Sequence, residues 1–470
     1  MIIASFLGFL LLFVFIGVLS VLKHKATTGD YLLAGRSVAP WLVSLSAVAT
    51  NNSGYMFIGM IGFTFIEGIS SLWLMVGWIS GDFITSLFVH RRLREKSAAI
   101  NAMSYGTVLS RWQGTDQSWV RLLGGLITLI FLGTYAAAQL KAGSKALYVL
   151  FGWDYSAGAI IGASIVLLYC FAGGIRASIW TDAAQSFVMV LAMLLLVIGG
   201  IYEVGGLSSV YGELAQVSPH YLDLFTPKVM ALGLGGPVLF FLGWLFAGFG
   251  VIGQPHIMVR FMAMNRSKDM RRVRVYYYSW YILFYLLTIG VGLLARILAP
   301  DTLQHDQELA LPRLALQLLP AVLVGLVLAG LFAATMSTAD SQILSCTAAI
   351  TQDFGLNRIQ TYWMTKAVTI LVCLVALCIA LLGTDSVFQL VLIAWGALAC
   401  AFVPLLTVLV CNGRPSELTA VLMMLTGLLV MVLWRQLNYG AIVYEIFPGM
   451  LAGFLPYFLQ IFQKSKAYLK

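Results

Sequence analysis

Long apolar segments separated by short polar loops run the length of the chain. A helix needs about 20 mainly apolar residues to cross the roughly 30 Å hydrocarbon core of a bilayer. Segments of this kind occur at about thirteen places, which are residues 2–22, 41–66, 69–90, 119–140, 157–174, 177–202, 230–259, 275–299, 318–350, 362–383, 386–411, 417–434 and 445–463. The pattern therefore predicts an all-α polytopic membrane protein with about thirteen transmembrane helices.

Two of the predicted spans are interrupted near their middle. The run at 41–66 contains the polar sequence TNNSG at residues 50–54, and the run at 230–259 contains AGFGVIGQP at residues 247–255. Polar groups and broken backbone at membrane depth are tolerated where they are buried in protein or line a cavity. Such an interruption is typical of a broken helix that binds an ion or solute. It is also typical of a helix-packing face made of small residues, and the pattern alone leaves both open.

The two interrupted spans are five spans apart. Interrupted helices at corresponding positions of two halves indicate an inverted-repeat transporter whose binding site lies near the midplane. We therefore expect one transporter domain over residues 1–470. It would comprise a first span and loop at 1–40, a first repeat at 41–202, a second repeat at 230–411, and two last spans with a tail at 412–470.

Composition agrees with this prediction and explains the charge. The chain is 60% hydrophobic and 10% charged, with a mean hydropathy of +0.92, which excludes an ordinary soluble domain. A formal charge of +9 would suggest nucleic-acid binding in a soluble chain, but 22 of the 28 Lys and Arg residues fall in alternate loops. By the positive-inside rule this pattern indicates membrane topology, with the amino terminus outside and the carboxyl terminus cytoplasmic. We expect no nucleic-acid partner.

The ninth predicted span combines hydroxyl groups with a carboxylate. Its sequence ATMSTADS at 334–341 places Ser337, Thr338, Asp340 and Ser341 inside an apolar run. Alkali cations prefer hard oxygen ligands, which hydroxyls and helix carbonyls supply without much fixed charge. Ser and Thr also bond back to carbonyls one turn earlier, but the cluster with Asp340 favours a cation site.

Six motifs occur in order: LAGRS at 33–37, SAVATNNSG at 46–54, WTD at 180–182, GQPH at 253–256, ATMST at 334–338 and YEIFPG at 444–449. With these motifs the chain resembles the sodium:solute symporter family over nearly its whole length, closest to the bacterial sodium/proline symporters. GQPH is the most specific signal. The resemblance implies a leucine-transporter-like fold of five plus five inverted repeats, alternating access and sodium-driven uptake.

The resemblance also implies ligands for the family's shared sodium ion. They are the backbone carbonyls of Ala49, Asn52 and Ala334 and the hydroxyls of Ser337 and Thr338. Simple packing is the alternative for the two alanines, because their side chains contain no ligand atom.

A second cation site is implied by the match of Asp182, Asp340 and Ser341 to family positions. Asp340 stands where a serine is more usual, whereas Asn51 replaces an aspartate that sodium/proline symporters usually carry. Two neighbouring carboxylates resist joint ionisation unless a cation lies between them, so we expect Asp182 and Asp340 to bind sodium or a proton. The alternatives are an ion pair of Asp182 with Arg176 and a simple hydrogen bond of Asp340.

Candidate solute-binding residues surround the two interruptions. They are Asn51, Asn52, Ser53, Tyr55, Tyr135, Gln139, Phe249, Gln254 and Trp395. For each aromatic residue, packing or a place at the membrane interface is the alternative. The Trp and Tyr of the proline carriers are replaced by Ala247 and Val251, which places proline itself in question. Because no buried Arg or Lys is evident near the first interruption, we expect a neutral or zwitterionic solute, or a carboxylate that binds to amides of the broken helix and to sodium.

Together these features predict a secondary active symporter in the bacterial cytoplasmic (inner) membrane. It would import a small polar organic solute, most simply an amino acid such as proline, with sodium as the coupling ion and no other cofactor. Nothing in the sequence resembles a P-loop, a zinc motif or a nucleophile elbow, so no enzymatic activity is expected. Two alternatives stay open: a transporter-like sensory receptor with a separate signalling partner, and a proton-coupled carrier of a monocarboxylate or other small solute. The oligomeric state is not predicted.

Overall fold

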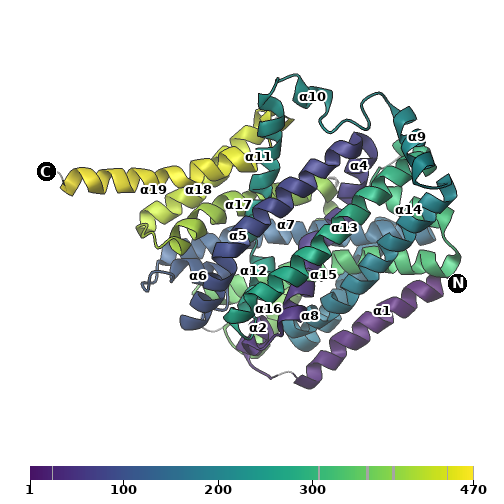
Figure 1. Cartoon of the computed structure of the whole chain (residues 1–470). Helices are drawn as coiled ribbons and strands as arrows, with labels where there is room; N and C mark the ends of the chain where they lie inside the picture. Colours follow the sequence, from purple (N-terminus) through teal and green to yellow (C-terminus); the bar gives the residue numbers. More distant parts are fainter. Residues whose placement is uncertain (24, 305–306, 356–358, 384–386, 442, 469–470) are drawn as a thin grey trace.

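The computed structural model describes residues 1–470 apart from 24, 305–306, 356–358, 384–386, 442 and 469–470. Helices dominate these residues (Figure 1), and an isolated backbone bridge joins Val38 to Met264. The helices are α1 (Ile2–Leu19), α2 (Thr28–Leu33), α3 (Pro40–Gly54), α4 (Ile61–Glu67), α5 (Leu72–Ala99), α6 (Tyr105–Ser110), α7 (Ser118–Phe151), α8 (Tyr155–Val204), α9 (Leu207–Val217), α10 (Pro227–Met230), α11 (Gly235–Phe249), α12 (Pro255–Met262), α13 (Met270–Leu298), α14 (Ala310–Leu318), α15 (Ala321–Asp353), α16 (Tyr362–Leu382), α17 (Val387–Val410), α18 (Glu417–Gln436) and α19 (Ile446–Tyr468).

Eleven helical segments of the described chain are long and apolar enough to cross a membrane. Two of them, Pro40–Ala99 with 60 residues and Tyr155–Val204 with 50, far exceed one crossing. Unbroken, they would measure about 90 Å and 75 Å at 1.5 Å per residue. Each instead contains a glycine with positive φ, Gly68 at 68° and Gly174 at 57°, which separates two crossings. The described helices therefore account for thirteen crossings, as predicted.

Helix α15 is the central element of the bundle (Figure 1). It packs against α7, α8, α3 and α1, and nearly all of its residues are buried. Polar and ionisable side chains at membrane depth are costly when they face lipid, so a helix that carries them is stable when other helices surround it. The hydroxyl-rich sequence of the ninth span is thereby placed in the protein interior, away from lipid.

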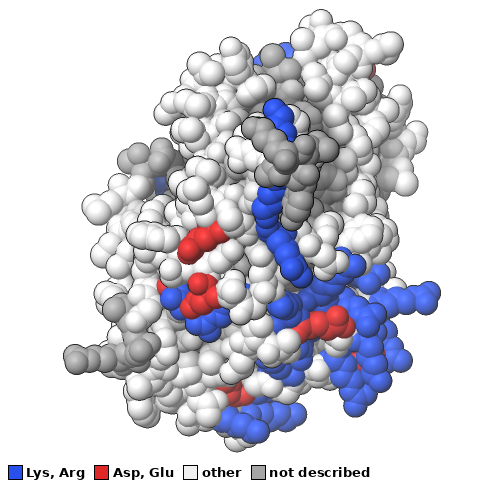
Figure 2. All heavy atoms as spheres, turned by 90° about the vertical axis from the view of Figure 1, so that its left-hand side faces the viewer, with Lys and Arg blue, Asp and Glu red and all other residues white. Residues whose placement is uncertain are grey.

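The face of the bundle that carries α6 and the end of α19 is rich in Lys and Arg (Figure 2). Exposed basic residues lie in the last third of α5 and precede or begin α13, and they are Arg91, Arg92, Arg266, Lys268, Arg271 and Arg272. The Ser267 hydroxyl joins the two segments by donating to the Glu95 carboxylate over 2.9 Å. One end of the bundle is therefore strongly basic.

Candidate ion and solute site

The first interruption is a true break in the helix. Helix α3 ends where Ser53 adopts φ 48° and ψ −175°, a π-helical turn follows over Tyr55–Met60, and α4 continues from Ile61. A positive φ is uncommon for a residue other than glycine, and it persists only where surrounding contacts fix it. The polar sequence at 50–54 is therefore a broken helix, and all five of its residues are buried.

Side chains of α7 stabilise the break. The Gly54 amide donates to Gln139 Oε1 over 2.8 Å, and the hydroxyls of Ser53 and Tyr135 lie 3.3 Å apart. Tyr135 and Gln139 are one helical turn apart and so project from the same face of α7. The two α7 residues predicted around the solute thus contact the break directly.

Helix α15 brings its hydroxyls to the same turn of α3. Thr338 Oγ1 lies 3.2 Å from the carbonyl oxygen of Thr50 and 3.1 Å from that of Ala334, and Ser337 Oγ also donates to Ala334 over 3.1 Å. The hydrogen bonds to the Ala334 carbonyl, one turn earlier, are the arrangement expected from the sequence as the alternative to a cation site. A hydroxyl that donates its proton retains oxygen lone pairs for a cation, so the bonds do not exclude a sodium ligand. The predicted ligands Ala49 and Asn52 lie on either side of Thr50 in the chain, and both are buried.

Several buried amide atoms around the two breaks have no hydrogen-bond partner among the described residues. They are Asn51 Oδ1, both side-chain polar atoms of Asn52, Gln139 Nε2 and Gln254 Oε1. An unpaired buried polar atom costs about 1–3 kcal/mol. Such a concentration at one depth indicates a place where water or a polar ligand binds.

The second interruption lies between α11 and α12. A 3-10 turn over Gly250–Gly253 leads to Gln254, which is extended. Helix α17 fixes this break: Gln254 Nε2 donates to the Trp395 carbonyl over 3.1 Å, and Trp395 Nε1 donates to the Ala247 carbonyl over 3.1 Å. The two predicted residues Gln254 and Trp395 therefore contact each other at the break.

Aromatic rings separate the breaks from one end of the bundle. The Trp78 ring lies 5.7 Å from that of Tyr55, 5.0 Å from that of Trp395 and 6.1 Å from that of Trp244, measured between centroids. The described ring partner of Phe249 is Phe246, at 5.0 Å. Trp244, which is not among the candidate solute-binding residues predicted from the sequence, is thus the α11 aromatic residue that contacts this group. Phe249 is not brought into it.

An open cavity of about 550 Å³ lies beside these rings. Trp244 and Tyr444 line it, and their rings lie 5.1 Å apart. Its wall also contains an ion pair of 2.8 Å between Arg435 and Glu445. A solute of amino-acid size can enter this cavity as far as the aromatic rings.

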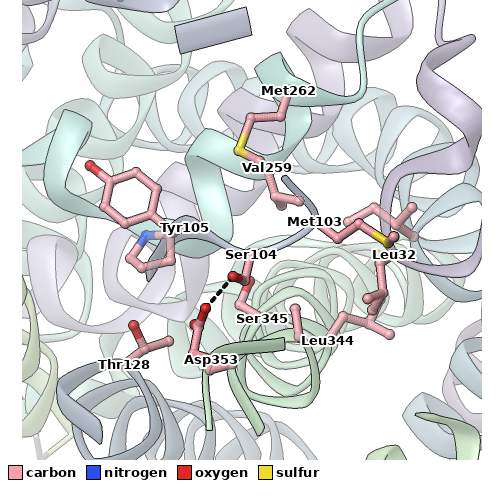
Figure 3. Close-up of a pocket in the computed structure, with 14 residues that line it drawn as sticks. Leu32, Met103, Ser104, Tyr105, Thr128, Val259, Met262, Leu344, Ser345 and Asp353 are labelled. Atoms are coloured by element: carbon pink, nitrogen blue, oxygen red, sulfur yellow. Dashed lines mark hydrogen bonds between the residues drawn. The ribbon is translucent and has the colours of Figure 1, made fainter. Parts of the chain in front are cut away.

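The opposite, basic end of the bundle contains a much smaller cavity. A cavity of only about 20 Å³ lies there between α6, α12 and α15 (Figure 3). Ser104 Oγ donates to Asp353 Oδ1 over 2.5 Å, while Asp353 Oδ2, Thr128 Oγ1 and Ser345 Oγ have no partner among the described residues. A space of this size with unsatisfied polar atoms fits one water molecule. The described cavities are therefore wide at one end of the bundle and narrow at the other.

The two carboxylates of the predicted second cation site flank an arginine side chain. Arg260 of α12 is fully buried, and its Nη2 lies 3.3 Å from Asp182 Oδ2 and 3.8 Å from Asp340 Oδ1. The expectation of no buried arginine near the first break is therefore wrong. Arg260 looked like a topology charge because it follows an apolar run, but the short helix α12 points it inward.

Hydroxyls complete this cluster. Ser46 of α3 donates to Asp182 Oδ2 over 2.6 Å, and Ser178 of α8 donates to Asp340 Oδ1 over 2.8 Å. Ser341 bonds Asp340 Oδ1 over 2.8 Å and also contacts the Arg260 guanidinium. Four helices, α3, α8, α12 and α15, thus meet at one charged cluster.

The ion pair considered between Asp182 and Arg176 is not present. Arg176 Nη2 instead contacts Asp30 Oδ1 of α2 at 2.5 Å and donates to the Ala34 carbonyl over 2.8 Å. Residues six apart on a helix do not share a face, so Asp182 points away from Arg176 toward Arg260.

The cluster retains one excess negative charge when both carboxylates are ionised. Arg260 supplies one positive charge for two carboxylates, and no other described Lys or Arg forms an ion pair with Asp182 or Asp340. Asp182 Oδ1 and Asp340 Oδ2 are both buried without a hydrogen-bond partner. A further cation would therefore be bound most favourably at these two oxygen atoms.

Comparison with known proteins identifies the class of this site. The sequence profile of the sodium:solute symporter family matches residues 31–427. The sodium/proline symporter of Escherichia coli (strain K12) is 30% identical over 443 residues, which is 90% of this chain and 86% of that protein. The osmoregulated proline transporter OpuE of Bacillus subtilis (strain 168) is 29% identical over 449 residues, 92% of this chain and 90% of that protein.

Solved structures agree on the fold. A sodium-coupled sialic acid symporter in a substrate-bound outward-open state aligns with a TM-score of 0.82 at 19% identity, covering 97% of this chain and 96% of that chain. The fold is therefore the leucine-transporter type with five plus five inverted repeats. The chain is embedded in a bacterial inner membrane, and it is a transporter that binds sodium and a small solute, not an enzyme. It belongs to the sodium:solute symporter family.

Proposed function

We propose that the protein imports a zwitterionic solute, with amino acids such as proline first, together with sodium. The observation that carries this proposal is the meeting of the α3 break with the hydroxyls of Ser337 and Thr338. Sodium bound between α3 and α15 would join the broken helix to the central helix and fix the solute site beside it. Solute and ion would then favour the same arrangement of helices, as symport requires.

The unsatisfied groups near the breaks support a solute without net charge. Asn51, Asn52 and Gln254 offer neutral donors and acceptors, and the rings of Tyr55 and Trp395 offer apolar surface. Arg260 is engaged by two carboxylates, which leaves it poorly placed to bind a solute anion. A zwitterion can place its carboxylate on amides of the broken helix and on sodium.

Proline is the first solute to test because the similar proteins from E. coli and B. subtilis are named as proline transporters. The exchange of two aromatic residues for Ala247 and Val251, both fully buried, changes the α11 wall. Trp244, one turn earlier on α11, stacks on Trp78 and restores an aromatic surface nearby. A site with this aromatic surface is therefore still compatible with a solute of similar size to proline.

Orientation follows from the charged face. With the basic end shown in Figure 2 in the cytoplasm, the amino terminus lies outside and the carboxyl terminus inside. With this orientation the 550 Å³ cavity would face the exterior, which supports entry of solute from outside.

Uptake into proteoliposomes tests the proposal. Purified protein should accumulate labelled amino acids when sodium is high outside, and a panel including proline, other amino acids, monocarboxylates and sugars should single out a zwitterion. Uptake driven by a proton gradient without sodium would contradict sodium coupling. Accumulation of a monocarboxylate but of no amino acid would contradict the solute class.

The shared sodium site gives the first prediction. Ser337→Ala and Thr338→Ala should each raise the sodium concentration for half-maximal uptake by about tenfold, equivalent to about 1.4 kcal/mol. The reason is the loss of one oxygen ligand, and solute affinity at saturating sodium should change less. Thr347→Ala is the matched control, because Thr347 is equally buried on α15 but bonds Ile343 and Thr369. Unchanged sodium dependence in both variants would move the ion elsewhere.

The second cation site gives the next prediction. Asp340→Asn should reduce the number of cations moved per solute, because it removes the excess negative charge beside Arg260. The measurement is the ratio of charge to solute in voltage-clamped proteoliposomes. Sodium should still stabilise the variant against heat, since Ser337 and Thr338 are intact. A parental charge ratio would show that the carboxylate pair binds no second transported cation.

A further inference from the structure

A further buried carboxylate, Asp82, lies outside the ion cluster. Asp82 is at mid-length of α5, is 0% exposed, and neither of its carboxylate oxygens has a hydrogen-bond partner of normal geometry among the described residues. No described Lys, Arg or His forms an ion pair with it. An isolated ionised carboxylate in apolar surroundings is highly unfavourable, so such a group must acquire a cation or a proton.

The neighbours of Asp82 are neutral. Tyr277 and Tyr278 of α13 are close enough for side-chain interaction, and Tyr281 also lies within electrostatic range. On the α11 side the neighbour is Gly248, where a Cβ would lie 2.9 Å from the Asp82 amide nitrogen. The titratable groups facing Asp82 from other helices are thus tyrosines.

A proton fits this environment better than a metal ion. Sodium needs several converging oxygen ligands, whereas the side chains that interact with the Asp82 carboxylate from another helix are the two tyrosines. Tyr277 already accepts a hydrogen bond of 2.6 Å from Asn51 Nδ2. A proton needs only the carboxylate itself.

Asp82 is connected to the first broken helix. Because the Tyr277 hydroxyl accepts from Asn51, its own hydrogen is free to point at Asp82. Ionised Asp82 would take this hydrogen bond, and protonated Asp82 would release it. The charge on Asp82 is therefore transmitted through Tyr277 to Asn51, inside the break at 50–54.

A polar stripe on α5 leads from Asp82 toward the basic face. Ser86, His90 and Arg94 follow at intervals of four residues, which places them along one side of the helix. His90 is 1% exposed, neither ring nitrogen has a partner in the described structure, and its ring stacks on Phe261 at 3.9 Å. Eight residues of helix place His90 about 12 Å beyond Asp82. Titratable groups thus line the side of α5 that runs to the basic end.

We propose that Asp82 binds a proton that regulates transport, and that this proton exchanges with the basic side along the stripe through His90. The inference rests on the proposed transport function, because the regulated process is solute uptake. The protonated form is the transport-competent one, since the closed surroundings of Asp82 accept a neutral group. Uptake should therefore fall as pH rises, by up to about tenfold per pH unit for a single proton.

Asp82→Asn tests this proposal, since the amide keeps the shape of the protonated acid and cannot ionise. Its sodium-driven uptake should stay nearly constant over the pH range in which uptake by the parent protein falls. Asp353→Asn is the matched control, because Asp353 is also a buried carboxylate but accepts hydrogen bonds from Ser104 and Thr107. That control should keep the parental pH profile. A parental profile in Asp82→Asn, or its loss in Asp340→Asn instead, would overturn the proposal.

Infrared spectroscopy supplies a readout that does not depend on transport. The difference spectrum between the purified parent protein and Asp82→Asn should show the carbonyl band of a protonated carboxyl group, and this difference band should be lost at high pH. His90→Phe, which preserves stacking on Phe261, should slow the response of this band to a pH jump. Absence of this difference band would refute the proton site, whereas absent sodium-driven uptake by the parent would refute the proposed function.

Discussion

Replacement of Arg260 by glutamine is expected to abolish solute uptake and to destabilise the protein strongly. Arg260 lies between Asp182 and Asp340 with every side-chain atom buried, and it also contacts hydroxyls on α3, α8 and α15. Removing one partner of a buried charge pair costs about 3–5 kcal/mol, because the remaining charges stay buried. The effect on stability is measured as the melting temperature in detergent, monitored by size-exclusion chromatography, and a large fall is expected.

Two further variants determine whether charge is the cause. Arg260→Lys keeps the charge but loses the forked geometry, so an intermediate loss is expected. The double variant of Arg260→Gln with Asp340→Asn removes one carboxylate with the arginine and should recover part of the stability. Sodium should also stabilise Arg260→Gln more than the parent protein, since an ion can replace the lost guanidinium. Parental stability of Arg260→Gln would show that the cluster needs no internal cation.

The second large effect is expected from Gly248→Ala at the crossing of α11 and α5. A Cβ at this position would lie 2.1 Å from the Trp78 carbonyl oxygen and 2.8 Å from its carbonyl carbon. Backbone atoms cannot yield as a flexible side chain can, so the two helices must separate. Overpacking of this kind typically costs about 1–3 kcal/mol, and it would displace Trp78 and Trp244 together.

We therefore expect Gly248→Ala to lower the melting temperature and to weaken solute affinity more than sodium affinity. Solute affinity should suffer because Trp78 contacts both Tyr55 and Trp395. Gly133→Ala on α7 is the control, since a Cβ there meets no atom within 4 Å and alanine favours a helix. Equal behaviour of the two variants would show that the α5–α11 contact is not tight.

The sequence by itself determined the number of crossings and the positions of both breaks. Apolar length decides whether a helix can span a bilayer, and this property is local to each segment. The breaks at Ser53 and at 250–254 were also predictable, because lipid cannot satisfy polar side chains and exposed backbone groups. The approach of Thr338 to the α3 break was expected from family resemblance, and the structure places the two in contact.

Only the tertiary structure decided which buried charges meet. Arg260 and Arg176 both follow apolar runs, and their positions in the sequence do not reveal which carboxylate each side chain faces. A rotation of about 100° per residue changes the face that a helical side chain occupies, so the kink at Gly174 and the short helix α12 assign Arg176 to Asp30 and Arg260 to Asp182. The isolation of Asp82 likewise depends on α13 and α11 packing around α5 with tyrosines and a glycine, because only an assembled bundle excludes both water and a counter-charge from a carboxylate.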